Sequence, residues 1–365
     1  MHPRSFVSVT GGYNNIGDAV IRRAAYEWRD PSEPAVLYAR DAPRAWDEQL
    51  RVAQRDSVLR ASRRRWLLRI ARSHKPVVIF EPGEVLLNLR AVPRELAFAA
   101  IGLLLRITGG VMILPPRAIV ERSRLAVLAH RMTCRVATVA YWRDLTSLKR
   151  VRVGDLVPDI AFGCDLRDGE PWENRRTVVV SLRGDRALPD EGWFDSVQRW
   201  AKSNAFDIVT VAQVEEDEDR ASWIAERLDA RHFAWESSPA VHEERVRELY
   251  GSARLAVSDR LHVLILAALG GAIPAELVPR PNGKVATHFS VIGFPNVSQD
   301  SEGLSSEQVD RFLSGQLMRR EEVAARIRAA NQQVAEALTF VHAKVEAAVS
   351  SRSSRPIGST GSCDT

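Results

Sequence analysis

The chain has few cysteines, few lysines and no long hydrophobic run. Its three cysteines, Cys134, Cys164 and Cys363, are far apart in the sequence, which excludes a disulfide scaffold and a zinc site built on thiolates. Its most apolar stretch, residues 96–105, ends at Arg106 and is shorter than the roughly 20 residues that span a bilayer. Residues 1–15 lack the apolar segment of a secretory signal peptide, so we expect a cytoplasmic protein.

Positive charge is concentrated in the first half and is carried mostly by arginine. Residues 1–168 contain 28 Lys and Arg against 17 Asp and Glu, whereas residues 169–365 contain 23 against 29. Such asymmetry is typical of proteins that bind nucleic acid or membranes, although a genomic composition bias would also produce it. The basic half has neither a helix-turn-helix pattern nor interleaved aromatics, so we expect no nucleic-acid partner.

Residues 55–75 concentrate these arginines and predict an amphipathic helix. The charged side chains are Arg60, Arg63, Arg64, Arg65, Arg69 and Arg72, and the apolar ones are Leu59, Trp66, Leu67, Leu68 and Ile70. One interpretation is peripheral contact with an anionic membrane, which would place the protein at the inner face of that membrane. The alternative is a surface helix whose apolar stripe packs in the core.

Short apolar runs alternate with helical patterns along the chain. Strands are predicted at residues 6–10, 35–38, 76–80, 110–114 (closed by Pro115 and Pro116), 136–140, 177–182, 207–211, 253–257 and 272–277. This alternation predicts an α/β protein with parallel sheets. A polar stretch at 165–176 separates the two halves, so we predict two Rossmann-like, doubly wound domains that face a cleft, residues 1–168 and 169–318. A long helix at 319–349 and a disordered tail at 350–365 would follow.

The loop Gly11–Asp18, GGYNNIGD, lies between the first predicted strand and the first helix. Glycine lets the backbone approach a ligand closely, and helix N-termini bind anions. The loop is neither a dinucleotide fingerprint nor a Walker motif. Its alternative interpretation is a tight strand-to-helix turn with Asp18 as a cap.

Two further segments follow predicted strands and carry arginine. Arg143 could clamp an anion with its guanidinium, or it could form a surface pair with Asp144. In the segment Ser258–His262, SDRLH, Arg260 and His262 fall in the first turn of a helix, where the helix dipole favours an anion and an imidazole can exchange protons. A capping or packing role is the alternative for His262.

No metal site is predicted, because the histidines show no metal-ligand spacing. The acidic run at 215–219 predicts a solvated loop, with a weak alternative as a magnesium site. Lys284 and Arg183 follow strands too, and solvation is the simpler interpretation of each.

Taken in order, these motifs resemble the polysaccharide pyruvyl transferase family. The resemblance rests on GGYNNIGDAVIRR, WRDLTS followed by Pro158-Asp159, VVVSLR, and SDRLHVLILAALGGAIP ahead of Lys284, and it spans residues 6–296. It implies two domains arranged as in GT-B glycosyltransferases. It also implies transfer of a pyruvyl group from phosphoenolpyruvate, without a further cofactor, to sugar hydroxyls of a bacterial surface glycan or its lipid-linked precursor, forming a ketal.

The resemblance also distributes roles among the residues. The donor would be bound by Arg143, Arg183, Arg260, Leu261 and Lys284. His262 would act in acid/base catalysis together with Arg260. The acceptor side would be formed by Gly12, Asn14, Asn15, Gly17 and Asp18. The alternative is a GT-B glycosyltransferase that uses a nucleotide sugar, and a third class is a non-catalytic glycan-binding protein, against which the retained Arg143, Arg260 and His262 argue.

Overall fold

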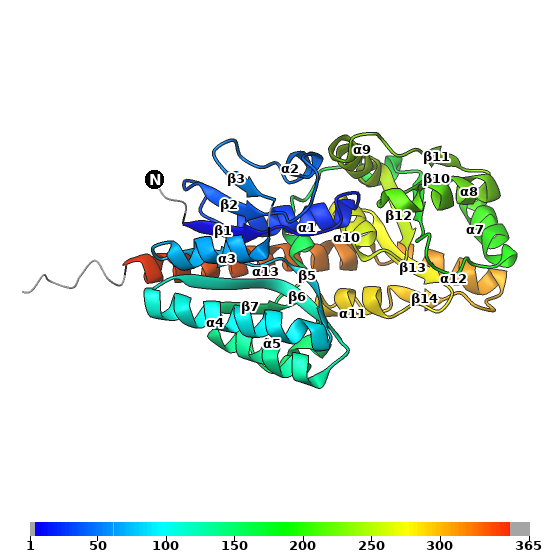
Figure 1. The fold of residues 1–365 in the computed structure, drawn as a ribbon. Helices are drawn as coiled ribbons and strands as arrows, with labels where there is room; N and C mark the ends of the chain where they lie inside the picture. Colours follow the sequence, from blue (N-terminus) through cyan, green and yellow to red (C-terminus); the bar gives the residue numbers. More distant parts are fainter. Residues whose placement is uncertain (1–3, 61, 351–365) are drawn as a thin grey trace, which may run out of the picture.

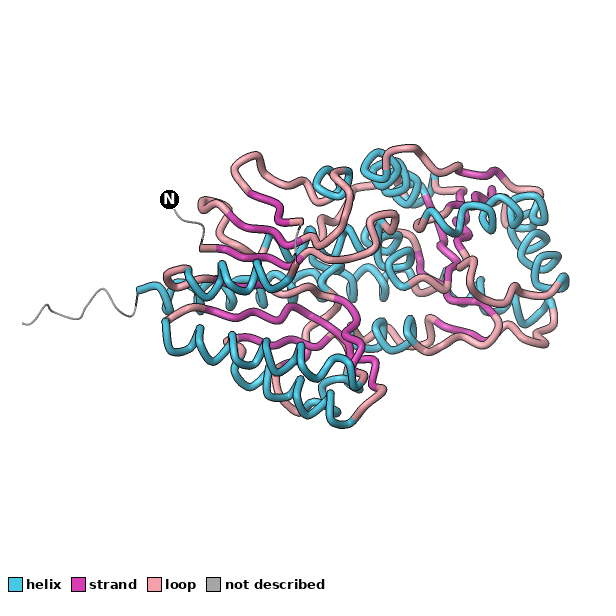
Figure 2. Tube along the Cα trace, in the orientation of Figure 1, coloured by secondary structure: helices cyan, strands magenta, loops and turns pink. Residues whose placement is uncertain are grey.

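The computed structural model describes residues 4–60 and 62–350, and the tail predicted to be disordered lies outside them from residue 351 onward. The chain forms two α/β domains, each built on a parallel sheet, which lie side by side in Figure 1. Figure 2 shows strands at the centre of each domain with helices around them. The predicted fold class, two doubly wound domains in a GT-B-like arrangement, is confirmed.

The first sheet has the strand order β3-β2-β1-β4-β6-β7-β8, with β5 paired to the far half of β6. Its strands are β1 (Ser5–Ser8), β2 (Ala35–Tyr38), β3 (Ser57–Leu59), β4 (Val77–Ile79), β5 (Gly83–Leu87), β6 (Val111–Glu121), β7 (Val139–Trp142) and β8 (Asp155–Leu156). Its helices are α1 (Ile16–Glu27), α2 (Ala45–Gln49), α3 (Arg63–Arg72), α4 (Val92–Thr108), α5 (Arg124–Val136) and α6 (Leu145–Val151). Strands β1, β2 and β4 are fully buried, as expected of a sheet covered on both faces.

The second sheet has the order β11-β10-β9-β12-β13-β14, and its registered pairs are parallel. Its strands are β9 (Thr177–Ser181), β10 (Asp207–Val211), β11 (Arg231–Phe233), β12 (Ala253–Ser258), β13 (Ile273–Val278) and β14 (Ser298–Asp300). Its helices are α7 (Glu191–Ser203), α8 (Glu218–Leu228), α9 (Pro239–Ser252), α10 (Leu261–Leu269), α11 (Lys284–Val291) and α12 (Ser306–Leu317).

The last helix, α13 (Arg320–Ser350), returns from the second domain to the first. The Asn331 side-chain amide donates to the carbonyl oxygens of Phe162 (2.8 Å) and Cys164 (2.9 Å). Further along, His342 Nε2 lies 3.2 Å from the carbonyl oxygen of Trp28. A helix anchored in this way ties the chain's end to the domain in which the chain began.

Two sequence predictions need correction in the first domain. The helix expected over 55–75 divides into β3 and the shorter α3, and α3 buries Trp66 and Ile70 completely. The strand expected to close at Pro115 and Pro116 instead continues to Glu121 as β6. A register shift between Leu114 and Arg117 takes up the two prolines, which cannot donate ladder hydrogen bonds.

Within the part of the chain that the structure describes, we find no helix that combines the length and the apolar character needed to cross a membrane.

Candidate active site

A cavity of about 260 Å³ opens between the two domains, at the carboxyl ends of their strands. Parallel α/β sheets bind their ligands at this edge. The cavity is lined by Asn15, Asp18, Ile21, Arg22, Gly83, Glu84, Arg143, Arg183, Arg186, Gln213, Asp259, Arg260, Leu261, His262 and Lys284. It therefore brings together eight of the residues singled out from the sequence, from both halves of the chain. Gly12 and Asn14 line a neighbouring cavity of about 560 Å³, which shares Asn15 with the first.

A buried carboxylate, Asp159, joins the two domains beneath this cavity. Its Oδ2 lies 2.5 Å from Arg143 Nη1 and 3.7 Å from His262 Nε2, and its side chain is 1% exposed. Burial would raise the pKa of Asp159, but the Arg143 guanidinium and the His262 imidazole outweigh it and hold that pKa well below its ordinary value. Asp159 therefore stays ionised; it accepts a hydrogen bond from the Arg143 guanidinium of its own domain and faces the His262 imidazole of the other domain.

His262 enters the site from the first turn of α10, whose N-cap is Arg260. It sits directly against Gly17 of α1, where an added Cβ would lie 2.5 Å from His262 Nδ1. The first backbone N–H groups of a helix have no partners within that helix and carry partial positive charge. The start of α10, with Leu261 and His262 lining the cavity, is therefore suited to an anion.

The cationic side chains around the cavity are each held by a carboxylate. Lys284 Nζ lies 3.0 Å from Glu84 Oε1, and Arg183 Nη2 lies 2.7 Å from Asp185 Oδ2. Arg260 pairs with Asp217, a buried residue of the acidic run at 215–219. Interpreting that run as a solvated loop was therefore wrong for Asp217, because tertiary packing supplies it with a cation.

Two opposing effects act on the pKa of Lys284. Burial and the charge of Arg143 lower the pKa of Lys284, while Glu84 raises it, and the net direction is downward. Glu84 itself has a lowered pKa, because the Lys284 and Arg143 charges outweigh the effect of burial. The two residues lie on opposite domains, so their contact forms a charged bridge across the mouth of the cleft.

The glycine loop is fixed on both sides by hydrogen bonds. Asp18 Oδ2 accepts from the Gly12 N–H (2.8 Å), and Asp18 Oδ1 lies 2.7 Å from Arg22 Nη1. Burial would raise the pKa of Asp18, but Arg22 and the Gly12 N–H hold it below its ordinary value. The cap of α1 is Asn15, whose side chain accepts from the Asp18 N–H, so Asp18 braces the loop rather than capping the helix.

The second domain also holds this loop from outside. The Ile16 N–H donates to the Gln213 carbonyl oxygen, and the Glu215 N–H donates to the Asn14 carbonyl oxygen, each at 3.1 Å. The Asn14 side chain adds a hydrogen bond to the Glu215 carboxylate. The N-terminal end of α1 is thus enclosed between the domains.

Sequence reasoning missed Arg22, Glu84, Arg186, Gln213 and His288. His288 Nδ1 donates to the Lys284 carbonyl oxygen (2.8 Å), and its Nε2 has no hydrogen-bond partner among the described residues. Burial, reinforced by Arg143, lowers the pKa of His288 to about 3. The only signal for it was its place one helical turn after Lys284. Among the described residues, no group of three or more His, Cys, Asp or Glu is arranged to hold a metal ion.

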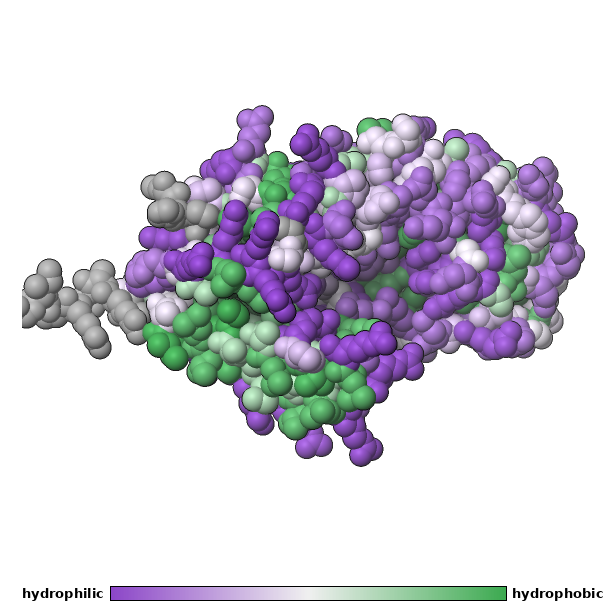
Figure 3. Space-filling model, viewed as in Figure 1, coloured by the Kyte–Doolittle hydropathy of each residue, from purple (hydrophilic) through white to green (hydrophobic). Residues whose placement is uncertain are grey.

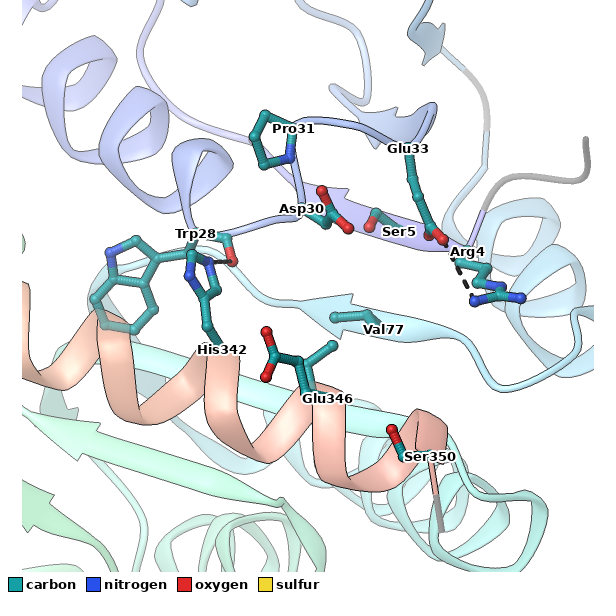
Figure 4. A pocket seen from close by; sticks show the side chains of 11 residues that line it. Arg4, Ser5, Trp28, Asp30, Pro31, Glu33, Val77, His342, Glu346 and Ser350 are labelled. Atoms are coloured by element: carbon teal, nitrogen blue, oxygen red, sulfur yellow. Dashed lines mark hydrogen bonds and ion pairs between the residues drawn. The ribbon is translucent and has the colours of Figure 1, made fainter. Parts of the chain in front are cut away.

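Figure 4 shows a different cavity, of about 340 Å³, at the opposite edge of the first sheet. It is lined by Ser5 and Val77, the first residues of β1 and β4. His342 and Glu346 of α13 form one of its walls. It contains none of the residues singled out from the sequence. Because ligands of parallel sheets bind at the carboxyl edge, the interdomain cleft is the better candidate site.

The fold is similar to that of solved UDP-GlcNAc 2-epimerases and of proteins solved in complex with UDP. UDP-GlcNAc 2-epimerase from Neisseria meningitidis bound to UDP-GlcNAc matches with a TM-score of 0.55 and 10% identity, over 94% of this chain and 99% of that one. Anabaena HepE in complex with UDP matches with a TM-score of 0.57 and 13% identity, over 92% and 99%. S. aureus MnaA, solved with UDP, matches with a TM-score of 0.54 and 10% identity, over 97% and 99%. No family model and no curated protein matches the chain.

These comparisons contradict the expected family. The similar structures are UDP-GlcNAc 2-epimerases and UDP-binding proteins rather than pyruvyl transferases, so the prediction of a pyruvyl transferase using phosphoenolpyruvate was wrong. The physical reason lies in the motifs themselves. An arginine after a strand and an Arg-Leu-His helix start are chemistry suited to an anion at the edge of a parallel sheet, and they do not distinguish a diphosphate from another dianion.

Proposed function

We propose that the chain is an enzyme that binds a nucleoside diphosphate sugar in the interdomain cleft and acts on its sugar. The observation that carries this proposal is the convergence of Arg143, Arg183, Arg260 and Lys284 on the start of α10. A diphosphate needs several cationic donors, and guanidinium groups bind phosphate oxygens in pairs of hydrogen bonds. The likeness of the fold to UDP-binding enzymes supports the same substrate class.

The arrangement suggests how the cleft divides between the two parts of such a substrate. The diphosphate would lie at the start of α10, where Arg183, Arg186 and Arg260 gather from the second domain. The sugar would then face the first domain, at Asn15 and Asp18. When the bond between the anomeric carbon and the phosphate oxygen breaks, the electron pair leaves with the nucleoside diphosphate. Fixed cations stabilise such developing charge without having to reorganise.

His262 is the side chain best placed to move a proton at the sugar. It lies between the two domains, and the ionised carboxylate of Asp159 faces its Nε2 at 3.7 Å. A carboxylate that faces an imidazole restricts the orientations open to the ring. We therefore expect His262 to take part in acid/base steps and Asp159 to position it.

Two reactions fit this site, and their products distinguish them. The UDP-GlcNAc 2-epimerases among the similar structures favour inversion at carbon 2 of the sugar. Transfer of the sugar to a glycan acceptor is the second candidate, because the same cleft places the anomeric carbon between two domains. Epimerisation requires no acceptor, whereas transfer releases UDP only when an acceptor is present.

Binding of UDP, UDP-GlcNAc and UDP-glucose, measured by titration calorimetry, tests the proposal. Arg260→Ala removes a charge-assisted hydrogen bond and is expected to weaken UDP binding about ten- to hundredfold. Arg311→Ala, on the exposed surface of α12, is the matched control and should bind as the wild type does. Magnetic resonance of the sugar products then separates epimerisation from transfer. If none of the three nucleotides binds, the proposed function is wrong.

A further inference from the structure

The outer surface of α4 and α5, together with the chain that leads from β5 into α4, carries a group of exposed apolar side chains. This α4–α5 face consists of Leu86, Leu89, Leu96, Leu103, Ile107, Leu125, Leu128 and Met132, each between 45% and 67% exposed. Figure 3 shows the group as a hydrophobic area over the lower part of the first domain, where Figure 1 places the two helices side by side. Exposed apolar areas of this kind mark interaction sites.

Helical spacing accounts for this face. Leu96, Leu103 and Ile107 recur at intervals of seven and four along α4, so they project from one side of that helix. The opposite side of α4 is already occupied, because Phe98 and Leu105 are buried in the core. On α5, Leu125, Leu128 and Met132 follow the same rule. Each of the two helices thus has two apolar sides, and only one side of each helix packs against the domain.

Positive charge surrounds the same region. Residues 62–136 contain 14 Lys and Arg and only 4 Asp and Glu. Each of the four carboxylates already has a cation: Glu81 has Arg63, Glu84 has Lys284, Glu95 has Arg94 and Glu121 has Arg150. The arginines left exposed are Arg64, Arg65, Arg69, Arg72, Arg90, Arg106, Arg122, Arg124 and Arg135.

Helix α3 brings its arginines next to the α4–α5 face. The Arg63 guanidinium lies over the ring of Phe98 in α4, at 5.5 Å from the ring centroid. Trp66 and Ile70 anchor α3 in the core, where Trp66 stacks on Tyr38. Apart from Leu68, which is 52% exposed, α3 therefore contributes mainly charge to this surface, and most of the apolar contact belongs to α4 and α5.

We propose that the α4–α5 face docks on an anionic phospholipid bilayer, with its leucines among the acyl chains and the surrounding arginines at the headgroups. The combination of an exposed apolar area with exposed arginines matches the two attractions of such a surface, hydrophobic burial and headgroup charge. A second copy of the chain fits less well, because two identical faces would bring their arginines together. The strand β5 links this face to the cleft, since it carries Glu84 at one position and Leu86 two residues later.

Vesicle flotation of the full chain tests this proposal independently of any nucleotide-sugar activity. At low ionic strength, the protein should float with vesicles of phosphatidylglycerol and phosphatidylcholine but not with pure phosphatidylcholine, and high salt should release it. The double variant Leu103→Glu with Ile107→Glu should no longer float. Replacing Arg64, Arg65 and Arg69 by glutamine should lower vesicle partition about a hundredfold, at about fivefold for each charge.

The control is Val241→Glu with Met318→Glu, which changes two exposed apolar residues of the second domain in the same way. It should float as the wild type does, and circular dichroism melting should show that every variant remains folded. The proposal is overturned if the wild type stays unbound at low ionic strength, or if the control loses binding to the same extent. A third result would also overturn it: the wild type does not bind vesicles, sedimentation shows that it is a dimer, and the Leu103→Glu, Ile107→Glu variant is a monomer.

Discussion

Replacing Gly17 by alanine probes the contact through which α1 and α10 approach each other. An added Cβ would lie 2.5 Å from His262 Nδ1 and 2.7 Å from His262 Cβ, well inside normal contact distances. Rotation of the imidazole cannot relieve the second contact, because the Cβ is fixed to the backbone of α10. The methyl group therefore forces the two helices, and with them the two domains, apart.

The expected cost follows from two opposing effects. Overpacking a closely packed site costs about 1–3 kcal/mol, while alanine in place of glycine in a helix contributes about 0.5–1 kcal/mol of stability. We therefore expect Gly17→Ala to lower the free energy of unfolding by about 1 kcal/mol, and by about 2.5 kcal/mol at most. Gly315→Ala in α12 is the matched control, because no atom lies within 4 Å of its added Cβ, and it should raise the same quantity by about 0.5–1 kcal/mol.

Urea unfolding followed by tryptophan fluorescence measures both variants. Calorimetric titration with UDP and turnover of UDP-GlcNAc then report on the site. A displacement of His262 by about 1 Å should reduce turnover by up to about a hundredfold. If Gly17→Ala matches Gly315→Ala in stability and the wild type in turnover, α1 does not press on His262, and the proposed junction of the domains is wrong.

Three further changes test the buried charges. Asp159→Asn removes the closer of the two carboxylates that face the buried Arg143 guanidinium and leaves only Glu84, at 3.9 Å. This should cost about 3–5 kcal/mol in the free energy of unfolding measured by urea; an unchanged midpoint would contradict the pairing with Asp159. Glu243→Gln should cost a similar amount, because it strips the buried Arg23 of its carboxylate across the domain interface, and an apolar replacement of both partners should recover most of the loss. The pKa of His288 is lowered from 6.5 to about 3, so the unfolded chain binds one more proton between these values and stability falls as the pH drops. His288→Gln should therefore reduce the dependence of unfolding free energy on pH, between pH 6 and pH 4, by about 1.4 kcal/mol per pH unit; equal slopes in variant and wild type would refute it.

Much of the architecture was predictable because its signals are local. Alternation of apolar runs with helical patterns indicated the two parallel sheets, and the rule that ligands bind at strand carboxyl ends placed Arg143, Arg260 and His262 in one cleft. Strand β6 was predicted too short because prolines usually end a strand, and here a bulge accommodates them. His288 was not predicted as a site residue, because the sequence does not show which side chains surround a histidine in a helix.

Local sequence also established which side chains are cationic and that they follow strands, and on this basis it predicted an anionic ligand. It did not determine which anion would bind, because a short motif indicates only the chemical type of the groups that contact a ligand. The nucleotide sugar that we propose instead is drawn from the fold of the whole chain and the structures it is similar to. Contacts between distant segments decided the rest: Asp159 meets His262, Gly17 abuts the same ring, and α4 keeps Leu103 and Ile107 exposed. Each of these depends on how two domains and their helices pack, which no window of neighbouring residues encodes.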